Sequence, residues 1–169
     1  GIPAGSTFDG NVVNYDLLPT FVDWAGGQPK KLKDIDGVSL ASYLRGRKPD
    51  EAFLKRYLYF HYPHNRTSMP HSAIVSGTDK VIHFYGHDDI PMLFDLAEDE
   101  AETTNLAGKN PEQHQALFGE MMRYLKAVDA RIPKVNPDFE PKAYKQMEAY
   151  EKRLPYGPFK ERRPAGDDE

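Results

Sequence analysis

The sequence predicts an α+β fold in which a small four-stranded antiparallel sheet is covered by one helix. Three observations predict it: four short strand-like runs follow one another, a long helical pattern comes after them, and an amphipathic helix precedes them. Short links between consecutive runs favour antiparallel pairing of neighbours. The four runs are 57–62, 73–76, 81–85 and 92–96.

The helix that precedes the strands is predicted from about Tyr15 to Ala25. Asn14 is suited to the N-cap position, and Gly26-Gly27 supplies a stop. Four apolar residues at helical spacing share one face of this helix: Leu18, Phe21, Val22 and Ala25. We expect this face to need a partner surface, because a contiguous exposed apolar patch usually marks an interface.

The strand assignments rest on residue type and on local breaks in the pattern. Residues 57–62 alternate between two sets of side chains, and Pro63 ends the run. A linker rich in Gly, Asp and Pro joins the third run to the fourth, which predicts a hairpin. The covering helix is predicted from Pro111 to about Ala130, because Asn110-Pro111 is a typical start. A second, weaker helix is expected within 143–154 and disorder within 160–169.

Composition narrows the classes of protein that fit. The 169 residues carry a formal net charge of −4, so no global positive field favours nucleic acid or an anionic membrane as a partner. No apolar run approaches the roughly 20 residues needed to cross a bilayer. The sequence contains 0 cysteines, which excludes disulfides and thiolate metal sites. The N-terminal residues contain no secretion signal.

Several segments resemble the C-terminal region of type I sulfatases, and together they cover most of the chain. The segments that carry the resemblance are 2–6, 15–26, 36–40 with 44–46, Phe60-His61-Tyr62-Pro63-His64, 72–77, 80–82, Leu93-Phe94-Asp95-Leu96, Glu102 and Asn105-Leu106. The resemblance implies that residues 1–50 end a large α/β sulfatase domain and its connector. Residues 51–133 would form the sheet-and-helix subdomain, and 134–169 an extended or partly helical tail.

The resemblance also implies chemistry that this chain does not carry. Family members use formylglycine, made from Cys or Ser in a C/S-x-P-x-R motif, together with a divalent cation that is usually calcium. The nearest match, Ser68-Met69-Pro70-His71-Ser72, has Ser where the motif requires Arg. We therefore expect a C-terminal piece of a sulfatase that binds neither group, has no catalytic residue and is inactive alone. Its expected partners are an N-terminal sulfatase domain and a sulfated carbohydrate, in the periplasm or outside the cell.

Four residues are candidates for substrate binding. His61 and His64 lie where the first strand passes into a loop that Pro63 constrains, and a sheet end of this kind often presents binding groups. Imidazole can donate a hydrogen bond or a charge to a sulfate. The alternative is that both imidazoles bond to backbone groups beside the sheet edge. Arg66 and His71 in the same loop would bind a sulfate or a sugar carboxylate, or would simply be solvated.

Other patterns are weaker indications of function. His83 and His87 invite a metal interpretation, but a strand and its turn do not supply the helical spacing that would bring them together. The acidic run 98–102 lacks the alternate ligands and central glycine of a calcium loop, so a structural turn is the alternative. Two rival functions stay open: a phosphodiesterase or phosphonate hydrolase of the same superfamily, and a non-catalytic carbohydrate-binding or assembly module.

Overall fold

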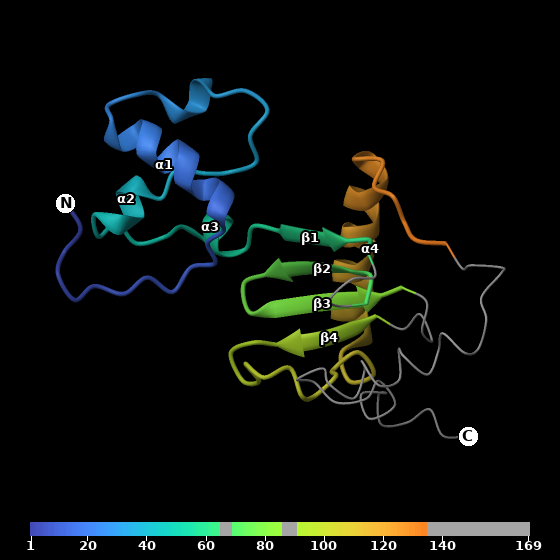
Figure 1. Cartoon of the computed structure of the whole chain (residues 1–169). Coiled ribbons are helices and arrows are strands. Elements are labelled where there is room, and N and C mark those ends of the chain that lie inside the picture. Colours follow the sequence, from blue (N-terminus) through green and yellow to red (C-terminus); the bar gives the residue numbers. More distant parts are fainter. Residues whose placement is uncertain (65–68, 86–90, 135–169) are drawn as a thin grey trace, which may run out of the picture. The chain divides into compact units, whose positions relative to one another are not determined.

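The computed structural model describes residues 1–64, 69–85 and 91–134. Within it the chain forms two compact units, Gly1–Arg56 and Tyr57–Glu169. The helices and strands follow the chain in the order shown in Figure 1. The helix expected within 143–154 and the disorder expected within 160–169 lie outside the described residues. No helix in the described ranges is long and apolar enough to cross a membrane.

Short helices and loops make up the first unit. Its elements are η1 (Asn14–Asp16), α1 (Leu17–Trp24), η2 (Pro29–Lys31), α2 (Ala41–Leu44) and α3 (Glu51–Leu54). The predicted helix from Tyr15 is therefore present, but its first turn is a 3-10 helix, and Asn14 lies inside that turn rather than at the N-cap. The backbone amide of Val13 donates instead to the Asp16 carboxylate at 3.0 Å.

Asp16 is the central residue of the first unit. Its carboxylate is fully buried and accepts hydrogen bonds from the amides of Val13 and Val38, both at 3.0 Å. The Arg56 guanidinium donates to both carboxylate oxygens, at 2.9 Å and 2.5 Å, and also to the Asn11 carbonyl at 2.8 Å. One side chain thus holds together the start of η1, the loop before α2 and the residue that ends the unit.

The backbone at Gly37 lies very close to the backbone at Tyr15, and this contact supports the bonds that Asp16 makes. A Cβ atom added to Gly37 would lie 2.1 Å from the carbonyl oxygen of Tyr15, so only glycine fits at this position. The approach places the amide of Val38 within reach of Asp16. The Thr20 hydroxyl adds a parallel link, because it donates to the Asp16 carbonyl at 2.6 Å and accepts from the Leu40 amide at 2.9 Å.

The apolar face predicted for this helix is exposed at Leu18, Phe21 and Ala25, whereas Val22 is partly buried. Leu18 is 53% exposed and Phe21 55%, whereas Pro19 and Thr20 on the other side of the helix are buried. Hydrogen bonds of Asp16 and Thr20 therefore help to hold the inward side of α1. On the apolar side, more than half of Leu18 and of Phe21 stays exposed within the described residues. We call the exposed residues Tyr15, Leu17, Leu18, Phe21 and Trp24 the α1 apolar surface.

The second unit contains the predicted sheet and its covering helix. The strands are β1 (Leu58–Tyr62), β2 (His71–Ser76), β3 (Asp79–Phe84) and β4 (Met92–Asp95), and they pair antiparallel in the order β1-β2-β3-β4. Helix α4 (Pro111–Ala127) lies across one face of the sheet, as Figure 1 shows. All four predicted strands are confirmed, with ends that differ by two residues or fewer. The helix ends slightly earlier than predicted.

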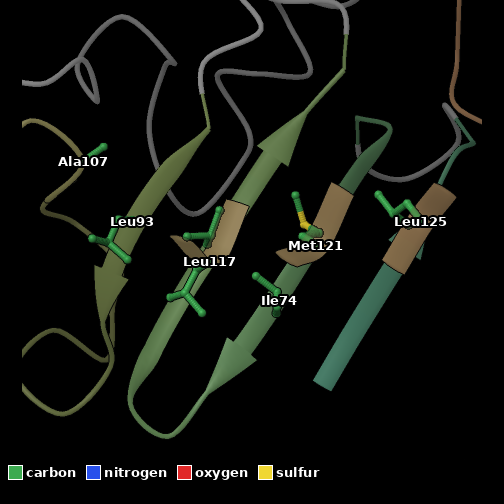
Figure 2. Packing of buried hydrophobic residues seen from close by; sticks show 7 residues of the cluster. Ile74, Leu93, Ala107, Leu117, Met121 and Leu125 are labelled. Atoms are coloured by element: carbon green, nitrogen blue, oxygen red, sulfur yellow. The ribbon is translucent and has the colours of Figure 1, made fainter. Parts of the chain in front are cut away.

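Apolar side chains cover both faces of this sheet. On the α4 face, residues from the strands, from α4 and from the loop before it form one buried cluster: Ile74, Val81, Leu93, Ala107, Leu117, Met121 and Leu125 (Figure 2). A second buried cluster lies on the opposite face: Met69, Ala73, Ile82, Phe84, Met92 and Phe94. Strand residues alternate between the faces, so β2, β3 and β4 each contribute to both clusters, whereas β1 contributes the partly buried Tyr59 to the α4 face.

Asn105 closes the outer edge of β4. Its side-chain oxygen accepts from the amide of Leu93 at 3.1 Å and from the amide of Ala107 at 3.0 Å. The amide of Leu106 donates to the Leu93 carbonyl at 2.7 Å. The Asn105-Leu106 pair noted in the sequence therefore satisfies both backbone groups that Leu93 presents away from β3.

Candidate functional site

One end of the sheet carries most of the residues singled out in the sequence. Strand β1 ends here, β2 begins here and β3 ends here, because antiparallel pairing places Tyr62 opposite His71 and His71 opposite Phe84. The next row inward consists of His61, Ser72 and His83. The fold therefore gathers imidazoles from three strands at the sheet end where the β1–β2 loop begins.

The imidazoles at this end point to opposite faces of the sheet. His61 and His83 share the α4 face: Tyr59, two residues before His61, stacks on Tyr124 of α4 with ring centroids 3.7 Å apart. His71 belongs to the opposite face, the side of Phe84. Side-chain alternation along a strand requires this division, because His71 pairs one row further out than the His61 row. His61 and His83 therefore lie on one face of the sheet and His71 on the other.

His61 is bonded through both ring nitrogens. Its Nδ1 lies 2.7 Å from the Ser72 hydroxyl, and its Nε2 lies 3.2 Å from the carbonyl oxygen of Arg131. The Ser72 hydroxyl in turn lies 2.6 Å from the hydroxyl of Tyr85. The bond to Arg131 matches the backbone-bonding alternative raised from the sequence. A role for His61 in substrate binding stays a prediction.

A row of packed rings leads from Tyr85, the last of these hydrogen-bonded residues, to the start of α4. The His83 ring packs edge-on against Tyr85 at 4.9 Å and against Phe118 of α4 at 5.3 Å. Phe118 stacks on His114, one helical turn earlier. Burial lowers the pKa of His114, and its hydrogen bond to the Pro91 carbonyl offsets part of that change. His114 is therefore kept neutral and serves as a packing group beneath this end of the sheet.

His64 and His71 surround Tyr62 on the loop side. The rings of Tyr62 and His64 are 5.8 Å apart, and those of Tyr62 and His71 are 5.7 Å apart. The Nδ1 of His71 bonds to the Met69 carbonyl at 2.8 Å, so that nitrogen carries the hydrogen. Within the described residues no hydrogen bond engages His71 Nε2, and the His64 side chain is exposed. These two imidazoles are the ones that remain available to a ligand.

The fourth candidate, Arg66, lies outside the described residues, and so does His87 of the metal interpretation. Among the described residues no group of three or more histidines and acidic side chains could hold a metal ion. Asp99 of the acidic run accepts from the Thr103 hydroxyl at 3.0 Å and from the Thr104 amide at 2.7 Å. Lys80 pairs with both carboxylate oxygens of Glu102. These side chains stabilise a turn.

Sequence reasoning missed Ser72 and Tyr85. Both look like ordinary strand residues along the chain, since only the register of three strands places their hydroxyls beside His61. One signal was present: Ser72 is a small polar residue at a fully buried position of a central strand. A buried hydroxyl requires a hydrogen-bond partner, and the Ser72 hydroxyl has two, His61 and Tyr85.

The fold is that of the C-terminal subdomain of a sulfatase-like hydrolase. A solved protein in complex with its substrate D-glucosamine-2-N,6-O-disulfate is 30% identical and has a TM-score of 0.56. The match covers 89% of this chain and 28% of that chain. The α+β class predicted from the sequence is thus confirmed.

The family model "N-sulphoglucosamine sulphohydrolase, C-terminal" matches residues 1–131, so the chain belongs to this family. An N-acetylglucosamine-6-O-sulfatase of Bacteroides thetaiotaomicron is 31% identical over 140 residues, covering 81% of this chain and 24% of the relative. The multifunctional alkaline phosphatase superfamily protein PehA of Trinickia caryophylli is 29% identical over 117 residues, covering 62% of this chain and 22% of the relative. The chain therefore spans about a quarter of the length of these relatives.

Proposed function

We propose that the protein containing this chain removes sulfate from sulfated glucosamine residues of a glycan, and that this chain is its C-terminal subdomain. The supporting observation is a shared sugar. The matched family is named for N-sulphoglucosamine, one relative for N-acetylglucosamine 6-O-sulfate, and one solved structure holds a glucosamine disulfate. A common sugar with different sulfate positions fits a subdomain that contacts the sugar rather than the bond that breaks.

The described residues do not fit the family's usual cofactors. Calcium requires several oxygen ligands at one point, and no group of three or more acidic or histidine side chains among the described residues could hold a metal ion. The sequence has no complete C/S-x-P-x-R motif from which formylglycine could form. In our proposal the upstream sulfatase domain supplies both groups, in a periplasmic or extracellular enzyme.

The contribution of this chain is a recognition surface at the sheet end. His64 is exposed, and the Nε2 of His71 is directed away from its bond to Met69. A neutral imidazole nitrogen accepts a hydrogen bond from a sugar hydroxyl, and a protonated one donates to sulfate. We place His64, His71 and Arg66 at the glycan in this proposal. In this proposal His61 does not contact the glycan, because both of its ring nitrogens are bonded to groups of this chain.

The test uses the full-length enzyme with glucosamine bearing sulfate at N2, at O6 or at both. We expect His64→Ala and His71→Ala to lower kcat/KM about 10- to 150-fold, the range for losing a hydrogen bond to a charged group. Thermal stability should change little for the exposed His64. His114→Ala is the matched control, since its ring packs on Phe118: it should lower stability and leave activity per folded molecule unchanged.

A second candidate function is hydrolysis of phosphate or phosphonate esters. The match to PehA favours it, because that relative is described as a multifunctional member of the alkaline phosphatase superfamily. Parallel assays with an aryl sulfate, a phosphodiester and a phosphonate monoester separate the two. Faster turnover of the phosphorus esters than of all sulfated glucosamines would replace the sulfatase proposal. The 169-residue chain alone should hydrolyse none of them.

A further inference from the structure

The two edge strands of the sheet differ in what covers their outer backbone groups. Strands β1 and β4 are the edges, at opposite sides of the sheet (Figure 1). On β4 the outward amide and carbonyl of Leu93 are bonded to Asn105 and Leu106. Strand β1 pairs with β2 on its inner side, so the groups on its outer side decide whether this second edge is closed or open.

The register identifies the residues that face outward on β1. The Tyr85 amide donates to the Pro70 carbonyl at 2.8 Å, in line with the pairing of β2 and β3. Counting from Pro70, every second residue of β2 therefore bonds to β3, and the residues between them bond to β1. By this alternation Phe60 bonds to β2, whereas Tyr59 and His61 direct their amides and carbonyls away from the sheet. Among the described residues no hydrogen bond engages these outward groups.

Strand β1 also lacks the residues that usually keep an edge strand unpaired. Natural edge strands carry charged side chains or proline, and the five residues Leu58–Tyr62 include no Lys, Arg, Asp, Glu or Pro. Phe60 is 45% exposed, and Tyr57, immediately before the strand, is 47% exposed. Both the backbone and the side chains of this edge therefore favour contact with a partner.

The remaining exposed apolar side chains of this unit lie beside the same strand. Val128 is 52% exposed and Ile132 39%, and with Tyr57 they complete the large hydrophobic residues that, besides Phe60, are exposed in the described part of the unit. Their segment contacts β1, because the Arg131 carbonyl lies 3.2 Å from His61 Nε2. The exposed apolar surface of this unit is thus concentrated around its open edge.

We propose that β1 pairs with β1 of a second copy of this chain, antiparallel and about a two-fold axis, so that two four-stranded sheets become one continuous sheet. A second copy fits because the edge is self-complementary. With Tyr59 opposite His61 of the second copy, every outward amide of these residues donates to an outward carbonyl. The two Phe60 side chains then meet at the axis, on the face opposite Tyr59 and α4. This inference does not depend on the proposed substrate.

A single introduced cysteine tests this register, because the sequence contains 0 cysteines. In the proposed pair the two Phe60 Cα atoms are about 4.5 Å apart, which suits a disulfide. Phe60→Cys should therefore form a disulfide-linked dimer in a glutathione buffer more than about tenfold faster than Tyr57→Cys. Tyr57 is the matched control: it is 47% exposed, against 45% for Phe60, but roughly 20 Å of strand separate its two copies. Equal rates for the two variants would overturn the proposal.

Hydrogen exchange of single amides separates this contact from association through the α1 apolar surface. The amides of Tyr59 and His61 should exchange more slowly as the concentration of the chain rises, because pairing of β1 covers them. The Leu93 amide, already bonded to Asn105 at 3.1 Å, is the matched control and should not change. Association of the chain without protection of the two β1 amides would contradict the proposal.

A charge placed on the axis should separate the copies. Phe60→Lys sets two cations opposite each other and removes the apolar contact, so the Kd of the pair should rise more than about tenfold. Gln115→Lys adds the same charge at an exposed position of α4 and should leave the Kd unchanged. An unchanged Kd in Phe60→Lys would refute the pairing.

The same measurements apply to the full-length enzyme. Sedimentation should show a dimer that Phe60→Lys dissociates, with the amides of Tyr59 and His61 protected only in the dimer. A monomeric enzyme in which both amides are protected at every concentration would show that another segment of the same polypeptide occupies this edge. That result would overturn the pairing of two copies.

Discussion

The interior of Gly1–Arg56 includes a buried ion pair and few apolar residues, whereas the described part of the second unit, Tyr57–Lys134, is apolar on both faces of its sheet. Asp16 and Thr20 are among the most buried residues of the first unit. Of the thirteen large hydrophobic side chains exposed in the described residues, nine belong to this unit. The second unit carries both buried apolar clusters.

The two units are therefore stabilised in different ways. The second unit gains its stability by removing apolar surface from water, which its own chain achieves. The first unit leaves Phe21 and Trp24 exposed, and its interior combines the Asp16–Arg56 pair with a small apolar group that includes the buried Phe53. Its α1 apolar surface fits an interface with the upstream domain that we propose for the full-length protein.

The largest expected effect follows from removing the buried carboxylate. Asp16→Ala leaves the Arg56 guanidinium and two amides without their acceptor, and breaking a buried pair costs about 3–5 kcal/mol. Hydrogen exchange measured separately over the two units should show loss of protection in Gly1–Arg56 only. Glu51→Ala, which removes the exposed pair with Lys55, is the control and should change nothing measurable. Equal loss of protection in both units would contradict the comparison.

The second unit should respond to a cavity instead. Met121 is fully buried between α4 and the sheet, so Met121→Ala should cost about 2–5 kcal/mol of unfolding free energy. The change should appear as faster exchange in β2, β3 and α4. Met122→Ala, at a partly buried position one residue along the same helix, should cost less. If Met122→Ala proved as costly as Met121→Ala, the packing described for α4 would be wrong.

Acid should destabilise the first unit through Asp16. Burial by itself would raise the pKa of Asp16, but the Arg56 guanidinium and the Val38 and Val13 amides outweigh it and leave the pKa below its ordinary value. The stabilisation is therefore present above the unfolded-state pKa of about 3.9 and is lost as pH falls through the lower folded-state value. Circular dichroism of wild type and Asp16→Asn along an acid titration checks this: the variant should lack the acid-induced step.

The smallest change in stability is expected at the α1 apolar surface. Leu18→Glu and Phe21→Glu replace side chains that are 53% and 55% exposed, so unfolding free energy should shift by no more than about 0.5 kcal/mol. Association of the isolated chain, measured by sedimentation, should decrease. In the full-length enzyme the same changes should be strongly destabilising. A large loss of stability in the isolated chain would mean that α1 packs its apolar face internally.

The sequence predicted those elements that depend on residues close to one another along the chain. All four strands were predicted from alternation and breaks, and α4 from its Asn110-Pro111 start. The helices α2 and α3 were not predicted, because four residues each are too few to show a helical period. The inward side of α1 was not foreseen either, since it relies on Arg56, 40 residues away from Asp16.

The candidate site was predictable only in outline. The imidazoles were found by residue type, and their common location at one sheet end follows from the strand order. Which face each occupies depends on register, and the bonding of His61 depends on Ser72, Tyr85 and Arg131, up to 70 residues away. No local pattern encodes contacts of that kind.

The closure of β4 by Asn105 bears on how this protein behaves at high concentration. An open strand edge is a template on which a second chain can pair and begin a fibre. Here the Leu93 amide and carbonyl at that edge are already occupied by Asn105 and Leu106. Asn105 and Leu106 therefore oppose edge-to-edge pairing of β4 with a second chain, although they do not form a strand.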